Sequence, residues 1–162
     1  MSLARAAPRE SSAHRTHYTH RSPPLSLSLS LSLSLSLLPR TQSLDLATCT
    51  VEDLAFTKTF TLTAQRSDFC HALVAYFDTT FSCCHTPVKL DTSPFSEYTH
   101  WKQTVFYLQD TFPVHAGEKF TATMTAAPNA SNPRDFDIEI AYAFASEKSG
   151  VAFERTQPFR LR

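Results

Sequence analysis

The residues best suited to metal or nucleophilic chemistry are Cys70, His71, Cys83, Cys84 and His85. Thiolates and imidazoles are preferred zinc ligands, and structural zinc sites usually place two of them two to four residues apart. Here the pairs are immediate neighbours, and neighbouring side chains on a strand point to opposite faces. We therefore predict no metal site in this segment. The same geometry argues against a nucleophilic Cys84–His85 pair.

Glycine is scarce, and this scarcity limits the cofactors that the chain can bind. Only Gly117 and Gly150 occur among the 162 residues. A nucleotide-binding loop needs several glycines within a few residues, because side chains would block the approach of the backbone to the ligand. The sequence therefore excludes a complete Rossmann-type domain, and we predict no cofactor-binding residues.

The zero net charge combines a basic N-terminal arm with a mildly acidic body. Residues 41–162 carry ten Lys or Arg against fourteen Asp or Glu, which argues against a nucleic-acid groove. No apolar run reaches the roughly 18 residues that span a bilayer, so we expect no membrane insertion. The start shows no secretory h-region, and we expect a cytoplasmic or nuclear protein with reduced thiols. We do not expect an organellar transit peptide.

Residues 1–48 differ in composition from the rest of the chain. Ser and Leu alternate almost without interruption from Leu25 to Leu38. Strict alternation is formally the pattern of a half-buried strand. One residue type per face, without a turn or a partner hairpin, instead indicates low complexity. We therefore predict that residues 1–48, including His14, His17 and His20, form a disordered tail rich in Ser, Leu and Arg. A translated dinucleotide repeat in the gene model would explain the alternation.

Residues 49–162 have the pattern of a β protein. Alternating or apolar segments separated by turn residues occur at residues 58–66, 69–81, 101–108, 119–125 and 136–142, and a short final strand is expected after Gly150. Pro87 and Pro94 bracket a loop with the turn residues Asp91, Thr92 and Ser93. Strands at such spacing, without a convincing helix, indicate an all-β barrel or sandwich.

Several strings in this region are more specific than its periodicity. They are HALVAYFDTTFSCCH (residues 71–85), LDTSP (90–94), YTHWKQTVFYLQD (98–110), residues 117–140 and the closing FRLR (159–162). In order and spacing they resemble the C-terminal β-barrel of type I protein arginine methyltransferases. The resemblance covers roughly residues 49–162.

The resemblance implies the second domain of a two-domain enzyme. In that family an S-adenosylmethionine-binding Rossmann domain precedes the barrel, a loop with two Glu residues holds the substrate guanidinium, and a helical arm mediates dimerisation. The family's Thr-His-Trp loop closes the arginine pocket from the barrel side. The matching substrate-pocket residues here are Tyr98, Thr99, His100 and Trp101. Trp101 could be a wall of that pocket or a core residue that begins its strand, and we favour the core role.

The departures from the family pattern limit the expected function. The glycine-rich cofactor motif and the paired-Glu loop are absent, and Glu139, Glu147 and Glu154 match no part of that loop. We expect the dimerisation arm and the first barrel strands to fall upstream of residue 49, which would leave the barrel incomplete with an open strand edge. No complete catalytic set is present.

We therefore predict a methyltransferase fragment that supplies the substrate-side barrel and is not catalytic alone, with S-adenosylmethionine bound only in the intact family. The alternative is a non-catalytic module that binds Arg-rich peptides or a full-length methyltransferase. Asp135, Asp137 and Glu139 on one strand are consistent with such basic partners, although a solvated face explains them equally. A third possibility is a chain that does not accumulate as a folded protein.

Overall fold

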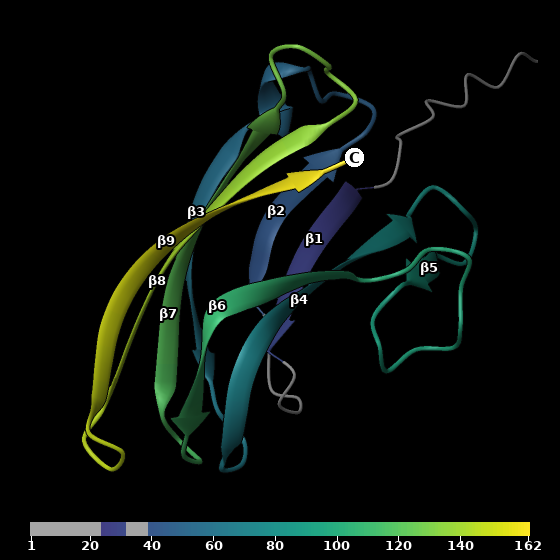
Figure 1. The fold of residues 1–162 in the computed structure, drawn as a ribbon. Helices are drawn as coiled ribbons and strands as arrows, with labels where there is room; N and C mark the ends of the chain where they lie inside the picture. The colour runs from purple at the N-terminus through teal and green to yellow at the C-terminus, as the bar shows by residue number, and fades with distance from the viewer. Residues whose placement is uncertain (1–23, 32–38) are drawn as a thin grey trace, which may run out of the picture.

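A computed structural model describes residues 24–31 and 39–162 of the chain. The remainder of the predicted tail, with His14, His17 and His20, lies outside the described residues. Two antiparallel sheets face each other across one hydrophobic core (Figure 1). The predicted all-β class is confirmed. No helix in the described ranges has the length and apolar character to cross a membrane.

The first sheet is organised around one long strand, β4. This sheet contains β1 (Pro24–Leu31), β2 (Arg40–Asp45), β4 (Asp68–Phe81), β5 (Val88–Asp91) and β6 (Thr104–Val114). One edge of β4 pairs with β1, which in turn pairs with β2. The other edge pairs first with β6, as far as Ala75, and then with β5, from Asp78 onwards. Residues 76 and 77 of β4 lie between these two paired stretches. The chain that connects β5 to β6 therefore leaves the sheet and returns to it beside these two residues.

The second sheet combines one early strand with the last three strands of the chain, and these three follow each other as an antiparallel meander. Its order is β3 (Phe56–Thr63), β7 (Lys119–Pro128), β8 (Phe136–Ser146) and β9 (Val151–Leu161), and a short 3-10 helix, η1 (Glu52–Leu54), precedes it. Gly117 and Gly150 lie in the turns before β7 and β9 with φ angles of +87° and +67°. Residues with side chains rarely adopt this left-handed conformation, so both turns require glycine.

The alternation predicted from the sequence is confirmed in the packing. Phe60 and Leu62 of β3 and Ile138 and Ile140 of β8 point into the core, and the residues between them are exposed. The centre of the core is aromatic. The ring of Phe112 on β6 lies 5.9 Å from the ring of Phe120, 4.8 Å from that of Phe144 and 4.8 Å from that of Phe153. These ring contacts join the first sheet to the second.

A side-chain amide joins the sheets between β6 and β9. The backbone N–H of Gln109 donates to Oε1 of Gln157 at 3.0 Å, and Nε2 of Gln157 donates to the carbonyl of Tyr107 at 3.1 Å. The side-chain amide of Gln157 thus acts like a peptide group of a neighbouring strand. It accepts a hydrogen bond from Gln109 and donates one to Tyr107, and both of these residues face outward on β6. An ion pair between Arg155 and Asp110, at 3.0 Å, lies along the same seam.

The predicted boundary at residue 48 does not coincide with the edge of the fold. β1 and β2 both belong to the first sheet, and β1 pairs with β4 from Leu25 opposite Thr79 to Leu31 opposite Leu73. Our interpretation of the Ser–Leu alternation as low complexity without a strand is therefore wrong for Pro24–Leu31. The reason is that β4, more than 40 residues away in sequence, supplies a partner that no local pattern reveals.

Three element boundaries also differ from the prediction. β6 begins at Thr104 and not at Trp101. The predicted loop between Pro87 and Pro94 contains the short strand β5. The last strand, β9, is 11 residues long and not short, because it pairs with β8 along its whole length.

Replacement of Phe112 by Ala should destabilise the barrel strongly. The side chain is 2% exposed and reaches from the first sheet to aromatic rings of the second, so the substitution leaves a cavity between the two sheets. We expect a loss of about 3–5 kcal/mol in the free energy of unfolding, measured by urea titration. Phe69→Ala is the matched control, because Phe69 is 60% exposed, and equal losses for the two variants would contradict this assignment of the core.

Candidate functional site

The candidate site is the β5–β6 loop, residues 92–103, which contains the four sequence-predicted pocket residues. Thr92 attaches the start of this loop to β4. Its backbone N–H and its hydroxyl both donate to the carbonyl of Phe77, at 3.1 and 2.7 Å, and its hydroxyl accepts from the N–H of Phe77 at 3.1 Å. Thr92 is 1% exposed, so these bonds are shielded from water. The Thr92 hydroxyl thus satisfies the N–H of Phe77, which lies where β4 passes from one partner strand to the next.

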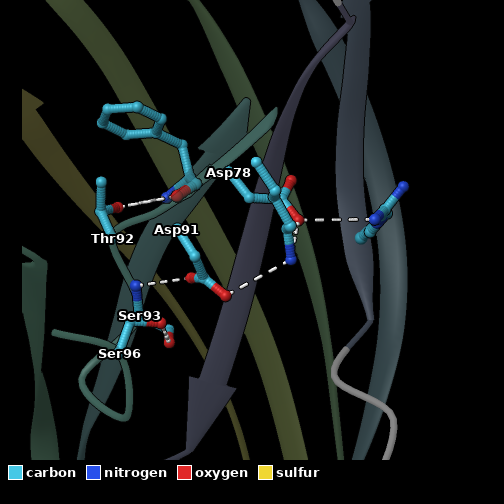
Figure 2. A network of polar contacts seen from close by, with 8 residues as sticks. Asp78, Asp91, Thr92, Ser93 and Ser96 are labelled. Atoms are coloured by element: carbon cyan, nitrogen blue, oxygen red, sulfur yellow. Dashed lines mark hydrogen bonds and ion pairs between the residues drawn. The ribbon is translucent and has the colours of Figure 1, made fainter. Parts of the chain in front are cut away.

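The residues on either side of Thr92 fix the direction of the loop. Asp91 Oδ1 accepts from the N–H of Ser93 at 2.9 Å, which is an Asx turn. The hydroxyls of Ser93 and Ser96 are 2.9 Å apart. Figure 2 shows these bonds next to the Thr92 contact. The sequence marked residues 91–93 only as turn formers, and their role as the anchor of the loop was missed.

The far end of the loop returns to the same anchor. Nε2 of Gln103 donates to the carbonyl of Thr92 at 2.7 Å, and the hydroxyl of Thr99 donates to the carbonyl of Trp101 at 2.9 Å. The two ends of the loop are therefore joined at Thr92, while the residues between them project away from the sheets (Figure 1). No signal in the sequence points to Gln103, since its partner is a backbone carbonyl.

A charge network on β4 and β5 supports the anchor. The carboxylate of Asp78, with a side chain 10% exposed, lies 2.9 Å from Nζ of Lys89 and 3.5 Å from Nη2 of Arg40 on β2. Lys89 also lies 3.3 Å from Asp91 (Figure 2). The hydrogen bond to Asp78 raises the pKa of Lys89. Burial opposes ionisation of Asp91, but the hydrogen bonds from Ser93 and the charge of Lys89 prevail and lower its pKa.

The four predicted pocket residues lie on the surface of this loop. Tyr98 is 85% exposed, and Nζ of Lys102 contacts its hydroxyl and lies 3.7 Å from its ring centroid. Trp101 is 51% exposed, and its ring lies edge-on to Phe77 at 6.2 Å and to His100 at 5.8 Å. The core role that we favoured for Trp101 is therefore wrong, because the strand begins three residues later.

A cavity of about 300 Å³ lies beside the anchor. Tyr98, Thr99 and Trp101 line it together with Thr92, but His100 does not. His100 is exposed, and within the described residues it forms no hydrogen bond or ion pair, its recorded contact being the Trp101 ring. The loop can therefore offer an aromatic wall and an imidazole to another group, but it holds no carboxylate against His100.

The other candidate residues do not converge on this loop. Asp137 accepts from Asn129 at 2.7 Å and from Arg160 at 2.9 Å, and these bonds lower its pKa. Asp135 accepts from Asn132 at 2.9 Å. The carboxylates of Asp135 and Asp137 therefore already have partners within the chain. Glu139 lines a groove of about 630 Å³ on the outer face of the same sheet.

The cysteines and glycines are also dispersed. Cys70 is buried, and burial raises the pKa of its thiol to about 12. Cys83 and Cys84 are exposed in the turn after β4, and the described residues contain no group of three or more His, Cys, Asp or Glu that could hold a metal ion. Gly117 lies in the turn from β6 to β7, which joins the two sheets, Gly150 lies in the β8–β9 hairpin turn, and neither precedes a helix. These residues do not fit a cradle for S-adenosylmethionine.

Comparison with known families decides the assignment. The family described as Arginine methyltransferase oligomerization subdomain matches residues 16–147, most of the chain. The chain belongs to the protein arginine methyltransferase family. The match begins ahead of β1, in agreement with the inclusion of that strand in the barrel.

The methyltransferase relatives are longer than this chain. Protein arginine N-methyltransferase 1 of Schizosaccharomyces pombe is 54% identical over 101 residues, which cover 62% of this chain and 30% of the relative. The protein of the same name from Oryza sativa subsp. indica is 44% identical over 121 residues, which cover 75% of this chain and 31% of the relative. The chain therefore spans about a third of the length of these relatives, and it corresponds to their C-terminal barrel.

Solved methyltransferase structures share the fold. The Trypanosoma brucei PRMT1 enzyme–prozyme heterotetrameric complex with AdoHcy matches with a TM-score of 0.73 at 37% identity, over 83% of this chain and 44% of that one. Protein Arginine Methyltransferase 10 of Arabidopsis thaliana matches with a TM-score of 0.69 at 16% identity, over 78% of this chain and 38% of that one, and shows the fold alone.

Replacement of Thr92 by Val should loosen the β5–β6 loop of this methyltransferase barrel. Valine keeps the shape but leaves the N–H of Phe77 without its acceptor, at an expected cost of about 1–3 kcal/mol in the free energy of unfolding. Trp101 is the only tryptophan, so its fluorescence reports on the loop, and acrylamide should quench it more strongly in the variant. Thr92→Ser keeps the hydroxyl and should behave like the parent. A Val variant with unchanged quenching would refute the role of the hydroxyl.

The anchor should weaken in acid through Asp91. Its folded-state pKa is lower than the ordinary value of 3.8, so its contribution to stability is complete above that value and is lost as the pH falls through the lowered pKa. Asp91→Asn keeps an oxygen for the Asx turn but cannot titrate. We expect its free energy of unfolding to fall less steeply than that of the parent between about pH 6 and pH 2, measured by urea titration at each pH. Parallel pH curves would contradict this.

Proposed function

We propose that this chain supplies the substrate-side barrel of a protein arginine methyltransferase, and that its β5–β6 loop closes the arginine pocket from the barrel side. The observation that carries the proposal is the architecture of the loop. Both of its ends are fixed at Thr92, yet Tyr98 and Trp101 remain 85% and 51% exposed. Exposed aromatic side chains on a well-anchored loop favour a contact surface over a structural role.

The chemistry of the loop suits a guanidinium substrate. Aromatic ring faces attract a planar cation, and the attraction grows when water is excluded. The Trp101 indole is held edge-on by Phe77, which leaves its orientation defined while half of its surface stays accessible. Among the described residues His100 has no hydrogen-bond or ion-pair partner, so its imidazole is available to a carboxylate from a cofactor-binding domain. Tyr98, Thr99, His100 and Trp101 are thus the residues proposed to contact or enclose the substrate side of the pocket.

Methyl transfer itself requires groups from elsewhere. The described residues offer no cradle for S-adenosylmethionine, and the sequence lacks the paired-Glu loop that the family resemblance calls for. We propose that the cofactor and these carboxylates come from a cofactor-binding domain, so that residues 24–162 are not catalytic alone. The cofactor product AdoHcy is present in the related Trypanosoma brucei complex, which supports S-adenosylmethionine as the methyl donor.

The proposed partners follow from the same assignment. Arg-rich protein segments are the expected substrates of the assembled enzyme. A full-length methyltransferase is the expected protein partner, because the matched family is described as an oligomerization subdomain and the Trypanosoma brucei relative assembles as an enzyme–prozyme heterotetramer.

A barrel exchange tests this function. Residues 24–162 replace the corresponding barrel of the Schizosaccharomyces pombe relative, and the chimera is assayed with labelled S-adenosylmethionine and a Gly-Arg-rich peptide. We expect methyl transfer by the chimera. His100→Ala should lower its kcat/KM by roughly a hundredfold, because loss of one positioning contact can cost that much.

The matched control is His71→Ala, since His71 is also exposed but lies on β4 away from the loop. This variant should keep the activity of the chimera. A chimera that binds AdoHcy and unfolds cooperatively but transfers no methyl group would refute the proposed substrate-side role. Equal losses for His100→Ala and His71→Ala would refute the assignment to His100.

A further inference from the structure

The turn between β4 and β5 carries two adjacent cysteines in an unusual setting. β4 ends at Phe81 and β5 begins at Val88, so Cys83 and Cys84 lie in the turn and not on a strand. The objection that neighbouring side chains point to opposite faces applies only to extended backbone. Rotation about the side-chain bonds in a turn lets two neighbouring thiols approach one ligand.

These two thiols are also the accessible ones. Both are exposed, whereas Cys49 is partly buried and Cys70 is 3% exposed in the core. The turn contains no other sulfur, and the next polar neighbour, His85, does not complete a group of three potential metal ligands. A site with two thiolates and no third protein ligand does not suit tetrahedral zinc, which needs four donors.

The ligand that fits must therefore be soft and must need only two protein sulfurs. We propose that Cys83 and Cys84 form a dithiol site for a trivalent arsenical that carries one organic substituent. Such an arsenic centre makes three bonds, of which the substituent supplies one and the two cysteines supply the others. Because the thiols are adjacent, the second sulfur binds intramolecularly at a high effective concentration.

A direct disulfide between the two cysteines is a poorer alternative. Neighbouring Cα atoms are about 3.8 Å apart across a trans peptide bond, whereas disulfides usually need about 4.4–6.8 Å. An arsenic atom between the two sulfurs lengthens the bridge and removes this constraint. The turn thus favours a bridged adduct over an oxidised pair.

The reaction is balanced without an external oxidant. An arsenoxide, R–As=O, reacts with the two thiols. Two S–As bonds form, the As=O bond breaks, and both thiol protons leave with the oxygen as one water molecule. Arsenic stays trivalent and neither sulfur is oxidised.

Phenylarsine oxide is the probe for the full chain, read by intact mass. We expect one adduct per chain, heavier by the reagent minus one water. It should persist in excess glutathione, a monothiol, and be released by 2,3-dimercaptopropanol, because only a second chelating dithiol competes with a two-sulfur bridge. Removal of the adduct by glutathione would overturn the proposal, as would an adduct that links two chains on size-exclusion chromatography.

Matched serine variants locate the site. Cys83→Ser and Cys84→Ser should each abolish the glutathione-resistant adduct, while Cys49→Ser and Cys70→Ser should retain it. Both turn positions are exposed, so serine there should leave the cooperative unfolding transition unchanged. A resistant adduct that survives in Cys84→Ser, or that is lost in Cys49→Ser, would overturn the assignment. Because no step involves methyl transfer, the outcome is independent of the proposed function.

Discussion

The hydroxyl of Thr92 bonds to both backbone groups of Phe77, and the arrangement of the β5–β6 loop depends on this pair. β4 is long enough to serve two partner strands on one edge, β6 along its first half and β5 at its end. Between those partners the backbone of β4 would be left unsatisfied inside the protein, which is costly. A side chain placed at the first residue of the loop solves this problem and simultaneously fixes the loop. The requirement to satisfy one strand edge therefore determines where the pocket residues emerge.

The charged groups around Asp78 extend that constraint to the N-terminal strands. A carboxylate with a side chain 10% exposed needs compensating partners, and it finds them on β5, through Lys89, and on β2, through Arg40. β2 does not pair with β4 directly, since β1 lies between them. The ion pair between Arg40 and Asp78 thus spans β1, and together with Lys89 it aligns β2, at the edge of the sheet, with the base of the β5–β6 loop. Lys89 and Arg40 are half or more exposed, so their main role is to specify this alignment and not to add much stability.

Sequence reasoning succeeded where a single physical signal determines structure. Alternation predicted the inward faces of β3 and β8, because burial of one face with exposure of the other leaves a period of two. The specific strings from Tyr98 to Asp110 predicted the family and the residues of the loop. Sequence reasoning failed where the structure depends on a residue or strand that is distant in the sequence. Thr92 looks like an ordinary turn residue, and the position of Trp101 outside the core follows from the late start of β6 at Thr104, which the backbone of β4 decides.

The Ser–Leu segment is a second case in which distant partners determine the structure. A strand beside β4 must alternate, and a two-residue repeat satisfies that requirement at every position. Such a repeat does not specify its own register, however, because a shift by two residues reproduces the same pattern on both faces. The register of β1 must therefore come from its neighbours. β2, whose sequence is not repetitive, pairs with β1 on the edge opposite to β4. A register irregularity between Leu27 and Ser28 marks the place where β1 and β2 adjust to each other. Arg40, paired with Asp78 across β1, then limits how far β2 can slide along the sheet. A low-complexity sequence can thus occupy a defined strand when the surrounding elements carry the information that it lacks.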